Sequence, residues 1–154
     1  MIRAYVPKQE DLWFRQALLA DPETMGYNHA WGGTIPFPMD QWSGWYDNWV
    51  VHTEGKRFYR YLVNDENEFV GEIAYHYDEA RAIHIADILV LAKYRGNGFG
   101  ELGLQMLCEL AKSNGVKVLY DDIAIDNPAV KMFLGNGFYE EYRTDEIMML
   151  KKDL

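Results

Sequence analysis

Hydrophobic and polar positions divide the chain into strand and helix patterns around one central segment. Residues 83–91 form an almost continuous run of β-branched and apolar residues, with a carboxylate, Asp87, in the middle. Such a run is typical of a strand that is buried on both faces. After a glycine-rich turn, apolar residues recur at helical spacing until Asn114-Gly115, which is a helix stop signal. A strand, a turn and a helix are therefore predicted for residues 83–113.

The same reasoning predicts the elements on either side of this segment. Between Asp21 and Pro38, glycines and prolines interrupt every pattern, so a long loop is predicted, and loops of this length are often functional. The predicted order of strands and helices is βααβββαβαβ with a closing strand. Strands are expected at residues 2–6, 58–63, 69–77, 83–91, 116–120 and 146–150, with a further one after Gly137-Phe138. Helices are expected after Pro7, at residues 39–51, after Gly100 as far as Ser113, and at residues 127–133.

Composition and charge narrow the class of protein. A chain of 154 residues is expected to form one domain, residues 1–154, large enough for a sizeable core. Its formal net charge of −9 argues against nonspecific nucleic-acid binding and fits a cationic partner. No stretch is long enough to span a membrane and no signal peptide opens the chain, so no membrane partner is expected and a cytoplasmic location is the default.

The turn Arg95-Gly96-Asn97-Gly98-Phe99-Gly100 lies where a strand meets a helix, and free backbone N–H groups and the helix dipole bind anions there. Read from Gly98 to Gly103, the turn fits a dinucleotide fingerprint, with Asp121 or Asp122 at the distance of a ribose-binding acid. A dinucleotide fold begins with its glycine turn, however, and only about 50 residues follow this one. A nicotinamide oxidoreductase is therefore a distant alternative. A P-loop is excluded because no Lys-Ser or Lys-Thr follows the glycines.

Taken as Arg95-x-x-Gly98-x-Gly100, the turn resembles the acyl-CoA pyrophosphate loop of the GNAT superfamily of N-acetyltransferases. A second motif supports this resemblance, because GNAT enzymes carry an Asn, a helix with Ala and Tyr, and then Gly-Phe. The residues at or within one position of those places are Asn127, Ala129, Phe133, Gly137 and Phe138. The resemblance covers residues 69–150 and implies an α/β (α+β) fold with a mixed, mostly antiparallel central sheet flanked by helices.

The resemblance implies acetyl-CoA as co-substrate, bound in a gap between the central strand and the strand at residues 116–120. The main chain of residues 89–91 would pair with the pantetheine arm like an added strand, and the glycine-rich turn would hold the pyrophosphate. Asn127 is expected either to contact the cofactor or to cap its helix. The expected cofactor-binding residues are Leu89, Val90, Leu91, Arg95, Gly96, Asn97, Gly98, Phe99, Gly100, Asn127 and Phe133.

Transfer to an amine requires a base, because a primary amine with a pKa of about 10.4 is neutral in only about one molecule in 10³ at pH 7. Many GNAT enzymes place a Glu or Asp on the central strand, and Asp87 is the leading candidate, acting through water. Burial would raise its pKa toward a useful value. The alternative is a carboxylate satisfied by neighbouring donors. The acceptor site is expected to include Trp31, Tyr75 and Asp121, and no metal is expected.

Phe133 departs from the family pattern, since many members carry there a Tyr that protonates the departing thiolate. A thiol with a pKa near 8.5 can leave without much help, so the general acid is left open and Phe133 is expected only to pack against the cofactor. The predicted function is an N-acetyltransferase that acts on the primary amine of a small cationic molecule or of a peptide. Alternatives are an acyltransferase with another acyl group or acceptor, and a catalytically weak acyl-CoA-binding sensor or interaction module. A homodimer is compatible with the resemblance.

Overall fold

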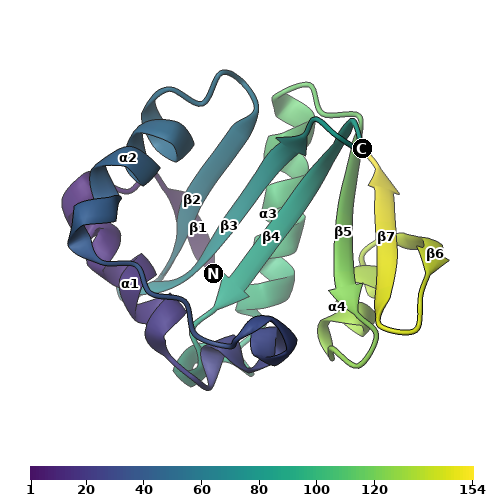
Figure 1. Cartoon of the computed structure of the whole chain (residues 1–154), viewed down its shortest axis with the longest axis horizontal. Coiled ribbons are helices and arrows are strands. Elements are labelled where there is room, and N and C mark those ends of the chain that lie inside the picture. Colours follow the sequence, from purple (N-terminus) through teal and green to yellow (C-terminus); the bar gives the residue numbers. More distant parts are fainter.

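The computed structural model describes residues 1–29 and 32–154 of the chain. Seven strands form one sheet in the order β1-β2-β3-β4-β5-β7-β6, flanked by helices (Figure 1). The strands are β1 (Ile2–Tyr5), β2 (Arg57–Asn64), β3 (Phe69–Asp78), β4 (Ile83–Val90), β5 (Val118–Ala124), β6 (Tyr139–Arg143) and β7 (Ile147–Asp153). The helices are α1 (Trp13–Ala20), α2 (Trp42–Tyr46), α3 (Phe99–Ser113) and α4 (Ala129–Gly135), with short helical segments η1 (Gln9–Leu12), η2 (Thr24–Trp31), η3 (Met39–Gln41), η4 (Asp47–Val51) and η5 (Ala92–Tyr94).

The expected element order and the mostly antiparallel sheet are both confirmed. Neighbouring strands pair antiparallel throughout, with β4 and β5 as the parallel exception. Parallel neighbours require a crossover connection, which α3 supplies here. The glycine-rich turn therefore lies at the carboxyl end of β4, where the chain leaves the sheet to enter α3.

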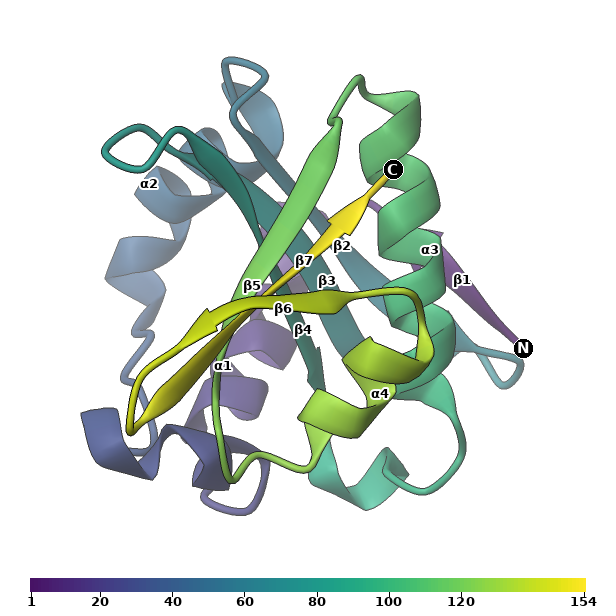
Figure 2. The same cartoon turned by 90° about the vertical axis from the view of Figure 1, so that its right-hand side faces the viewer.

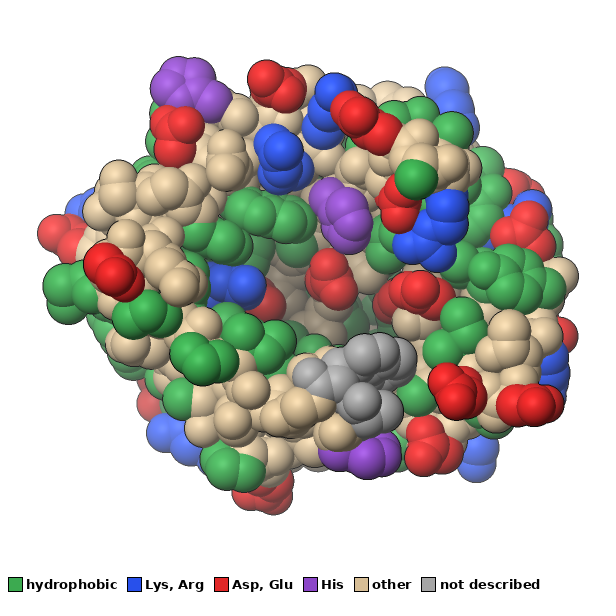
Figure 3. Space-filling view, viewed as in Figure 1, with side chains coloured by type: hydrophobic (Ala, Val, Ile, Leu, Met, Phe, Trp, Pro, Cys, Tyr) green, Lys and Arg blue, Asp and Glu red, His purple; other side chains and the backbone are tan. Residues whose placement is uncertain are grey.

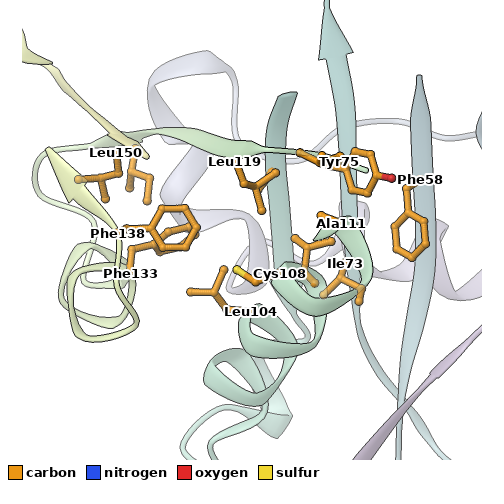
Figure 4. Packing of buried hydrophobic residues seen from close by; sticks show 14 of the residues in the cluster. Phe58, Ile73, Tyr75, Leu104, Cys108, Ala111, Leu119, Phe133, Phe138 and Leu150 are labelled. Atoms are coloured by element: carbon orange, nitrogen blue, oxygen red, sulfur yellow. The ribbon is translucent and has the colours of Figure 1, made fainter. Parts of the chain in front are cut away.

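The two faces of the sheet carry separate hydrophobic cores. One face, the α3–α4 face, is covered by α3 and α4, and the other, the α1–α2 face, by the N-terminal helices (Figures 1 and 2). Gly103 lets α3 lie close to the sheet, because a Cβ at this position would stand 2.8 Å from Leu62 Cδ1. The side chains of Leu104, Cys108 and Ala111 fill the space beside it (Figure 4). A rigid sheet thus presents β4 between two packed layers.

The central strands β4 and β5 separate soon after they meet. Only two residue pairs join them, His84 with Leu119 and Ile85 with Tyr120. Beyond Ile85 the two strands diverge toward the carboxyl end of β4, and the ribbons leave a wedge between them (Figure 1). β5 instead continues its pairing with β7 along its whole length. The sheet is therefore interrupted on the side where the glycine-rich turn lies.

Three predicted elements need correction. The segment Asp21–Pro38 is partly helical, because it contains η2; Asp21 Oδ2 accepts hydrogen bonds from the backbone N–H and hydroxyl of Thr24 at 3.3 and 2.5 Å and so starts that helix. A 3₁₀ helix lacks the periodicity that identifies an α-helix in sequence. The helix expected at residues 39–51 consists of η3, α2 and the π-helical η4. The strand expected at residues 116–120 begins at Val118 and extends to Ala124.

Candidate active site

The glycine-rich turn leaves the first backbone N–H groups of α3 free. Gly96 and Gly98 have φ angles of +83° and +79°, in the left-handed region that favours glycine. Gly98 is the N-cap of α3 without a side-chain hydrogen bond, and nothing lies within 4 Å of the position that its Cβ would take. The N–H groups and the positive end of the helix dipole are therefore available to an anion, as expected for a pyrophosphate loop.

Arg95 fastens this turn to the N-terminal half of the chain. Its Nη1 and Nη2 donate to the carbonyl oxygens of Glu23 at 3.3 Å and Thr24 at 2.9 Å. The hydroxyl of Thr24 in turn accepts a hydrogen bond from the N–H of Ala92 at 2.9 Å. The guanidinium that we expect at a pyrophosphate thus also holds η2 against the start of the turn.

Main-chain groups of β4 line the wedge between β4 and β5. The N–H of Leu91 donates to the carbonyl of Val70 at 2.9 Å, so Leu91 turns its backbone toward β3. Because N–H and C=O groups alternate in direction along an antiparallel ladder, Ile88 and Val90 direct theirs toward the wedge. Of the three residues expected to pair with a pantetheine arm, Val90 therefore has the required orientation, while Leu89 and Leu91 face β3.

Asp87 lies on the α1–α2 face, one residue before this stretch. Its partner across the ladder is Ala74, which belongs to the core on that face. A hollow lies there over the middle of β3 and β4, with acidic and basic side chains on its walls (Figure 3). The Asp87 side chain is exposed to solvent, yet the surrounding protein disfavours its charged form, and this desolvation raises its pKa to about 7. Repulsion from Glu72 adds to the rise, while Arg15 opposes it.

An ion pair between α1 and β3 forms one wall of the hollow. Arg15 Nη1 donates to both carboxylate oxygens of Glu72, at 3.1 and 3.0 Å, and the hydroxyl of Tyr59 also donates to Glu72. The Arg15 side chain is 18% exposed and that of Glu72 8%. Arg15 Nε is buried and has no hydrogen-bond partner among the described residues. The pair places a fixed positive and a fixed negative group beside Asp87 without a net charge.

Aromatic rings enclose this ion pair from the side of α2 and η4. The guanidinium carbon of Arg15 lies 4.4 Å from the ring centre of Trp45, a cation–π distance. Trp45 stacks on Trp49 at 5.9 Å and meets Tyr59 edge-on at 4.7 Å. Trp49 in turn lies 5.9 Å from the ring of His76. The helix expected at residues 39–51 thus uses its tryptophans both to fill the core and to bound the hollow.

Asp121 and Tyr27 approach the same region from other elements. Burial raises the pKa of Asp121 well above its ordinary value, and the carboxylates of Asp87 and Asp122 raise it further. Tyr27 is 45% exposed, yet partial desolvation raises its pKa to about 12, with contributions from Asp87, Glu72 and Asp121. Among the expected acceptor residues, Asp121 therefore lies close enough to Asp87 for the Asp87 carboxylate to raise its pKa.

Two expected site residues lie in the core of the α3–α4 face. Tyr75 stacks on Phe58, with ring centres 5.1 Å apart, and its hydroxyl accepts a hydrogen bond from Asn114 Nδ2 at 3.0 Å. Tyr75, an expected acceptor residue, therefore points to the opposite face of the sheet from Asp87. Phe133 is 1% exposed and packs against Phe138 at 4.9 Å (Figure 4). An apolar ring on a short amphipathic helix can pack either in the core or against a ligand, and the Phe133 ring packs in the core.

Asn127 caps its helix. Its Oδ1 accepts a hydrogen bond from the N–H of Ala129 at 2.9 Å. Of the two roles expected for Asn127, cofactor contact or helix capping, the structure shows the second. Asn97 behaves similarly, since its side-chain amide donates to the carbonyl of Tyr94 at 2.8 Å and so closes the turn. Trp31, expected at the acceptor site, lies outside the described residues.

Sequence reasoning did not identify Arg15, Tyr59 and Tyr27 as residues of the site. Arg15 occupies an ordinary position of an amphipathic helix, and the partner that explains it is on β3, far away in sequence. Tyr59 alternates on β2 with Phe58, and nothing local shows which of the two faces the hollow. A hint was the carboxylate of Glu72 within a hydrophobic strand pattern, because a buried carboxylate needs a partner.

The described residues contain no group of three or more His, Cys, Asp or Glu side chains arranged to hold a metal ion. No helix within the described part of the chain is long and apolar enough to cross a membrane.

Comparison with known proteins places the fold. A spermidine N-acetyltransferase from Vibrio cholerae in complex with CoA and spermine superimposes with a TM-score of 0.81 at 16% identity, over 97% of this chain and 94% of that one. An N-acetyltransferase from Staphylococcus aureus gives 0.74 at 20% identity, over 99% and 97%. A ribosomal-protein-alanine N-acetyltransferase from Brucella melitensis gives 0.72 at 23% identity, over 100% and 99%. At these identities the likeness shows a shared fold.

No curated protein sequence matches the chain. Residues 17–138, however, match the sequence profile described as the acetyltransferase (GNAT) family. This match spans well over half of the chain and includes the glycine-rich turn, β4 and β5. The chain therefore belongs to the acetyltransferase (GNAT) family.

Proposed function

We propose that this protein transfers an acetyl group from acetyl-CoA to the primary amine of a small cationic molecule or of a peptide. The observation that carries this proposal is the position of Asp87, which lies on the α1–α2 face of β4, within the stretch where β4 no longer pairs with β5. A donor in the wedge and an acceptor in the hollow would meet beside a carboxyl whose pKa is about 7. Membership of the acetyltransferase family supports the class of reaction.

The donor would bind along the wedge. The free N–H groups at the start of α3 would hold the pyrophosphate, and Gly98 allows the main chain to approach it closely. The outward main-chain groups of Ile88 and Val90 would pair with the pantetheine arm like a neighbouring strand. The structure of the Vibrio cholerae spermidine N-acetyltransferase contains CoA, which supports this donor for the fold.

In the reaction, Asp87 takes a proton from the acceptor ammonium through a water molecule. The amine nitrogen then attacks the thioester carbonyl, an N–C bond forms, and the N–H of Val90 stabilises the negative oxygen of the tetrahedral intermediate. The C–S bond breaks and CoA leaves as a thiolate, while the second amine proton passes to solvent. A base with a pKa of about 7 suits this work, since about half of it is ionised at neutral pH.

The hollow favours a cationic acceptor. Asp87 and Glu72 contribute carboxyl groups, with Glu72 already paired with Arg15, and Asp121 on β5 lies close enough to Asp87 to interact with it electrostatically. The rings of Trp45 and Trp49 add π faces that attract cations. Together with the net charge of −9, these groups support an acceptor that carries at least one ammonium group besides the one that reacts.

Thiol release from acetyl-CoA tests the proposal. The wild type should turn over at least one amine from a panel of spermine, a diamine and a peptide with a free N-terminal alanine, with kcat/KM rising up to about pH 7 and then levelling. In Asp87→Asn, kcat/KM should fall on the order of 10²- to 10⁴-fold and keep rising toward the pKa of the free amine. Asp145→Asn, in the exposed turn before β7, is the matched control and should behave as wild type. An unchanged pH profile in Asp87→Asn would remove Asp87 from the mechanism.

A catalytically weak acyl-CoA sensor is the second candidate, favoured by the buried Phe133 where many relatives carry an acidic tyrosine. Thermal unfolding separates the two functions. A ligand at 100 times its Kd adds about 2.7 kcal/mol to the free energy of unfolding, a rise of roughly 5 to 10 °C for a domain of this size. Stabilisation by acetyl-CoA without turnover of any amine would favour the sensor, and stabilisation by NAD alone would contradict both.

A further inference from the structure

A second pocket lies at the open edge of β2, away from the glycine-rich turn, and shares Trp49 with the wall of the hollow. β1 covers β2 only from Tyr61 to Asn64, so the first half of β2 is a free sheet edge. A cavity of about 340 Å³ occupies this edge, between η4 and the end of α3. It is lined by Trp49, Val50, Thr53, Gly55, Arg57, Phe58, Arg60, Tyr75 and Asn114. We refer to it as the β2-edge pocket.

The lining of the β2-edge pocket is cationic in an acidic protein. The chain carries 24 Asp and Glu against 15 Lys and Arg, yet this lining contains two arginines and no acidic residue. Its other polar side chains are a threonine hydroxyl, a tyrosine hydroxyl and an asparagine amide, each of which can donate a hydrogen bond. Such a lining is complementary to an anion and unfavourable for the cationic acceptor expected in the hollow.

Arg60 is half-buried in this pocket without an acidic partner. Its guanidinium carbon lies 4.4 Å from the ring centre of Phe58, and Nη1 donates to the carbonyl of Tyr59 at 2.7 Å. Burial lowers the pKa of Arg60, whereas no ion pair within 4 Å offsets this cost among the described residues. The remaining N–H groups of the guanidinium form a fork that matches an oxyanion.

Arg57 reaches the same pocket from the other side of the strand edge. Its Nη1 donates a long hydrogen bond of 3.5 Å to the carbonyl of Asn48, and Arg57 too has no ion pair within 4 Å among the described residues. Among the other described arginines, Arg15, Arg81 and Arg143 form ion pairs, whereas Arg3 and Arg95 do not. What sets this pocket apart is that two guanidinium groups without a carboxylate partner line the same cavity.

We propose that the β2-edge pocket binds a small molecule through a phosphate or carboxylate group held by Arg57 and Arg60. The amide of Asn114, at the end of α3, and the hydroxyl of Thr53 would complete the donor set. The pocket is distinct from the proposed pyrophosphate loop, because α3 separates the two by its 15 residues, roughly 22 Å. The inference does not depend on acetyl-CoA binding or on the proposed transfer reaction.

Titration with inorganic phosphate and with acetate, monitored by NMR of backbone and side-chain amides at constant ionic strength, tests this site. We expect saturable shifts for the Asn114 side-chain amide and for the arginine Nε–H groups of the pocket, with sodium chloride as the reference. Arg60→Gln should weaken the binding at least tenfold, and Arg57→Gln provides a second test if the first variant folds poorly. Arg143→Gln, whose residue pairs with Glu140 far from the pocket, should bind as wild type.

The outcomes separate the two anion sites. Shifts confined to residues 96–100 would assign phosphate to the glycine-rich turn and overturn the proposal, as would equal binding by Arg60→Gln and wild type. Equal shifts with chloride would show nonspecific ion binding and would also overturn it. Phosphate and acetate are compared at the same concentration, so the stronger of the two identifies the favoured oxyanion. Repeating the titration with excess CoA shows whether the two sites fill independently, whichever way the transferase assay turns out.

Discussion

At the scale of single residues, the hollow combines Asp87, whose pKa of about 7 lies near neutrality, with Glu72, which is held in an ion pair. Desolvation, with repulsion from Glu72, raises the pKa of Asp87 to about 7, and no hydrogen bond lowers it. Glu72, on the neighbouring strand, is held by Arg15 and Tyr59. Two carboxylates in different environments can thus serve different roles, a proton acceptor and a fixed charge. This contrast depends on tertiary partners, since the sequence around each residue is similarly apolar.

The raised pKa of Asp87 predicts a pH-dependent stability. Between about pH 4 and pH 7 the folded protein keeps the Asp87 proton while the unfolded chain loses it, so the free energy of unfolding falls as pH rises through this window. Asp87→Asn removes this effect and should therefore raise the melting temperature at pH 8 relative to wild type, with the gain shrinking toward pH 4. Calorimetry at several pH values measures this, and a gain that is equal at pH 4 and pH 8 would contradict the titration of Asp87.

Removing one partner of the buried Arg15–Glu72 ion pair should lower the free energy of unfolding substantially. Arg15→Met leaves the Glu72 carboxylate buried without its cation, which should lower the free energy of unfolding by about 3 to 5 kcal/mol in urea denaturation. Arg143→Met breaks an exposed pair with Glu140, whose side chains are 55% and 36% exposed, and should cost at most about 1 kcal/mol. Similar losses in the two variants would show that burial does not set the value of the Arg15 pair.

At the scale of elements, much of the structure follows from local pattern. The run at residues 83–91, the glycine turn and the helix after it were predictable because strand composition, positive-φ glycines and helical periodicity are all local signals. η2 was not, since a 3₁₀ helix stabilised by Asp21 and Thr24 leaves no 3.6-residue period. The side of the sheet on which Tyr75 and Phe133 pack was also beyond local pattern, because both faces of β3 are buried and α4 is too short for a clear stripe.

The glycine-rich turn predicts a ligand effect that can be separated from backbone strain. Gly98→Val should weaken acetyl-CoA binding at least tenfold, since a side chain would stand where a pyrophosphate approaches the main chain. Gly115→Val is a close control, because Gly115 has a φ of +90° and equally open surroundings at the other end of α3. Both variants should lose similar stability, about 1 to 2 kcal/mol, and only the first should lose affinity. Calorimetric titration with acetyl-CoA checks this, and equal affinities would argue against the loop assignment.

At the scale of the whole molecule, the arrangement of the sheet is what local signals could not supply. Element order and a resemblance were enough to expect a mostly antiparallel sheet and a gap beside the central strand, and both the sheet and the separation of β4 from β5 are present. The hollow, however, collects side chains from α1, η2, β2, β3 and β4, and its composition depends on how distant segments pack. Asp87 could be proposed from the sequence because it is the one carboxylate in the apolar run of the central strand, and its role stays a prediction.

The separation of β4 from β5 also divides the molecule into two cooperative units. With two ladder pairs between them, the unit of β5, β6, β7 and α4 is joined to the rest mainly by side-chain packing in the core beneath the sheet. Local opening of this junction breaks few backbone hydrogen bonds, so the amide hydrogens of β5 that face β4, unlike those bonded to β7, should exchange with solvent by a low-energy subglobal fluctuation rather than by complete unfolding. A ligand that pairs with β4 in the wedge would lock the two units together, so that binding slows exchange across a strand that it need not touch.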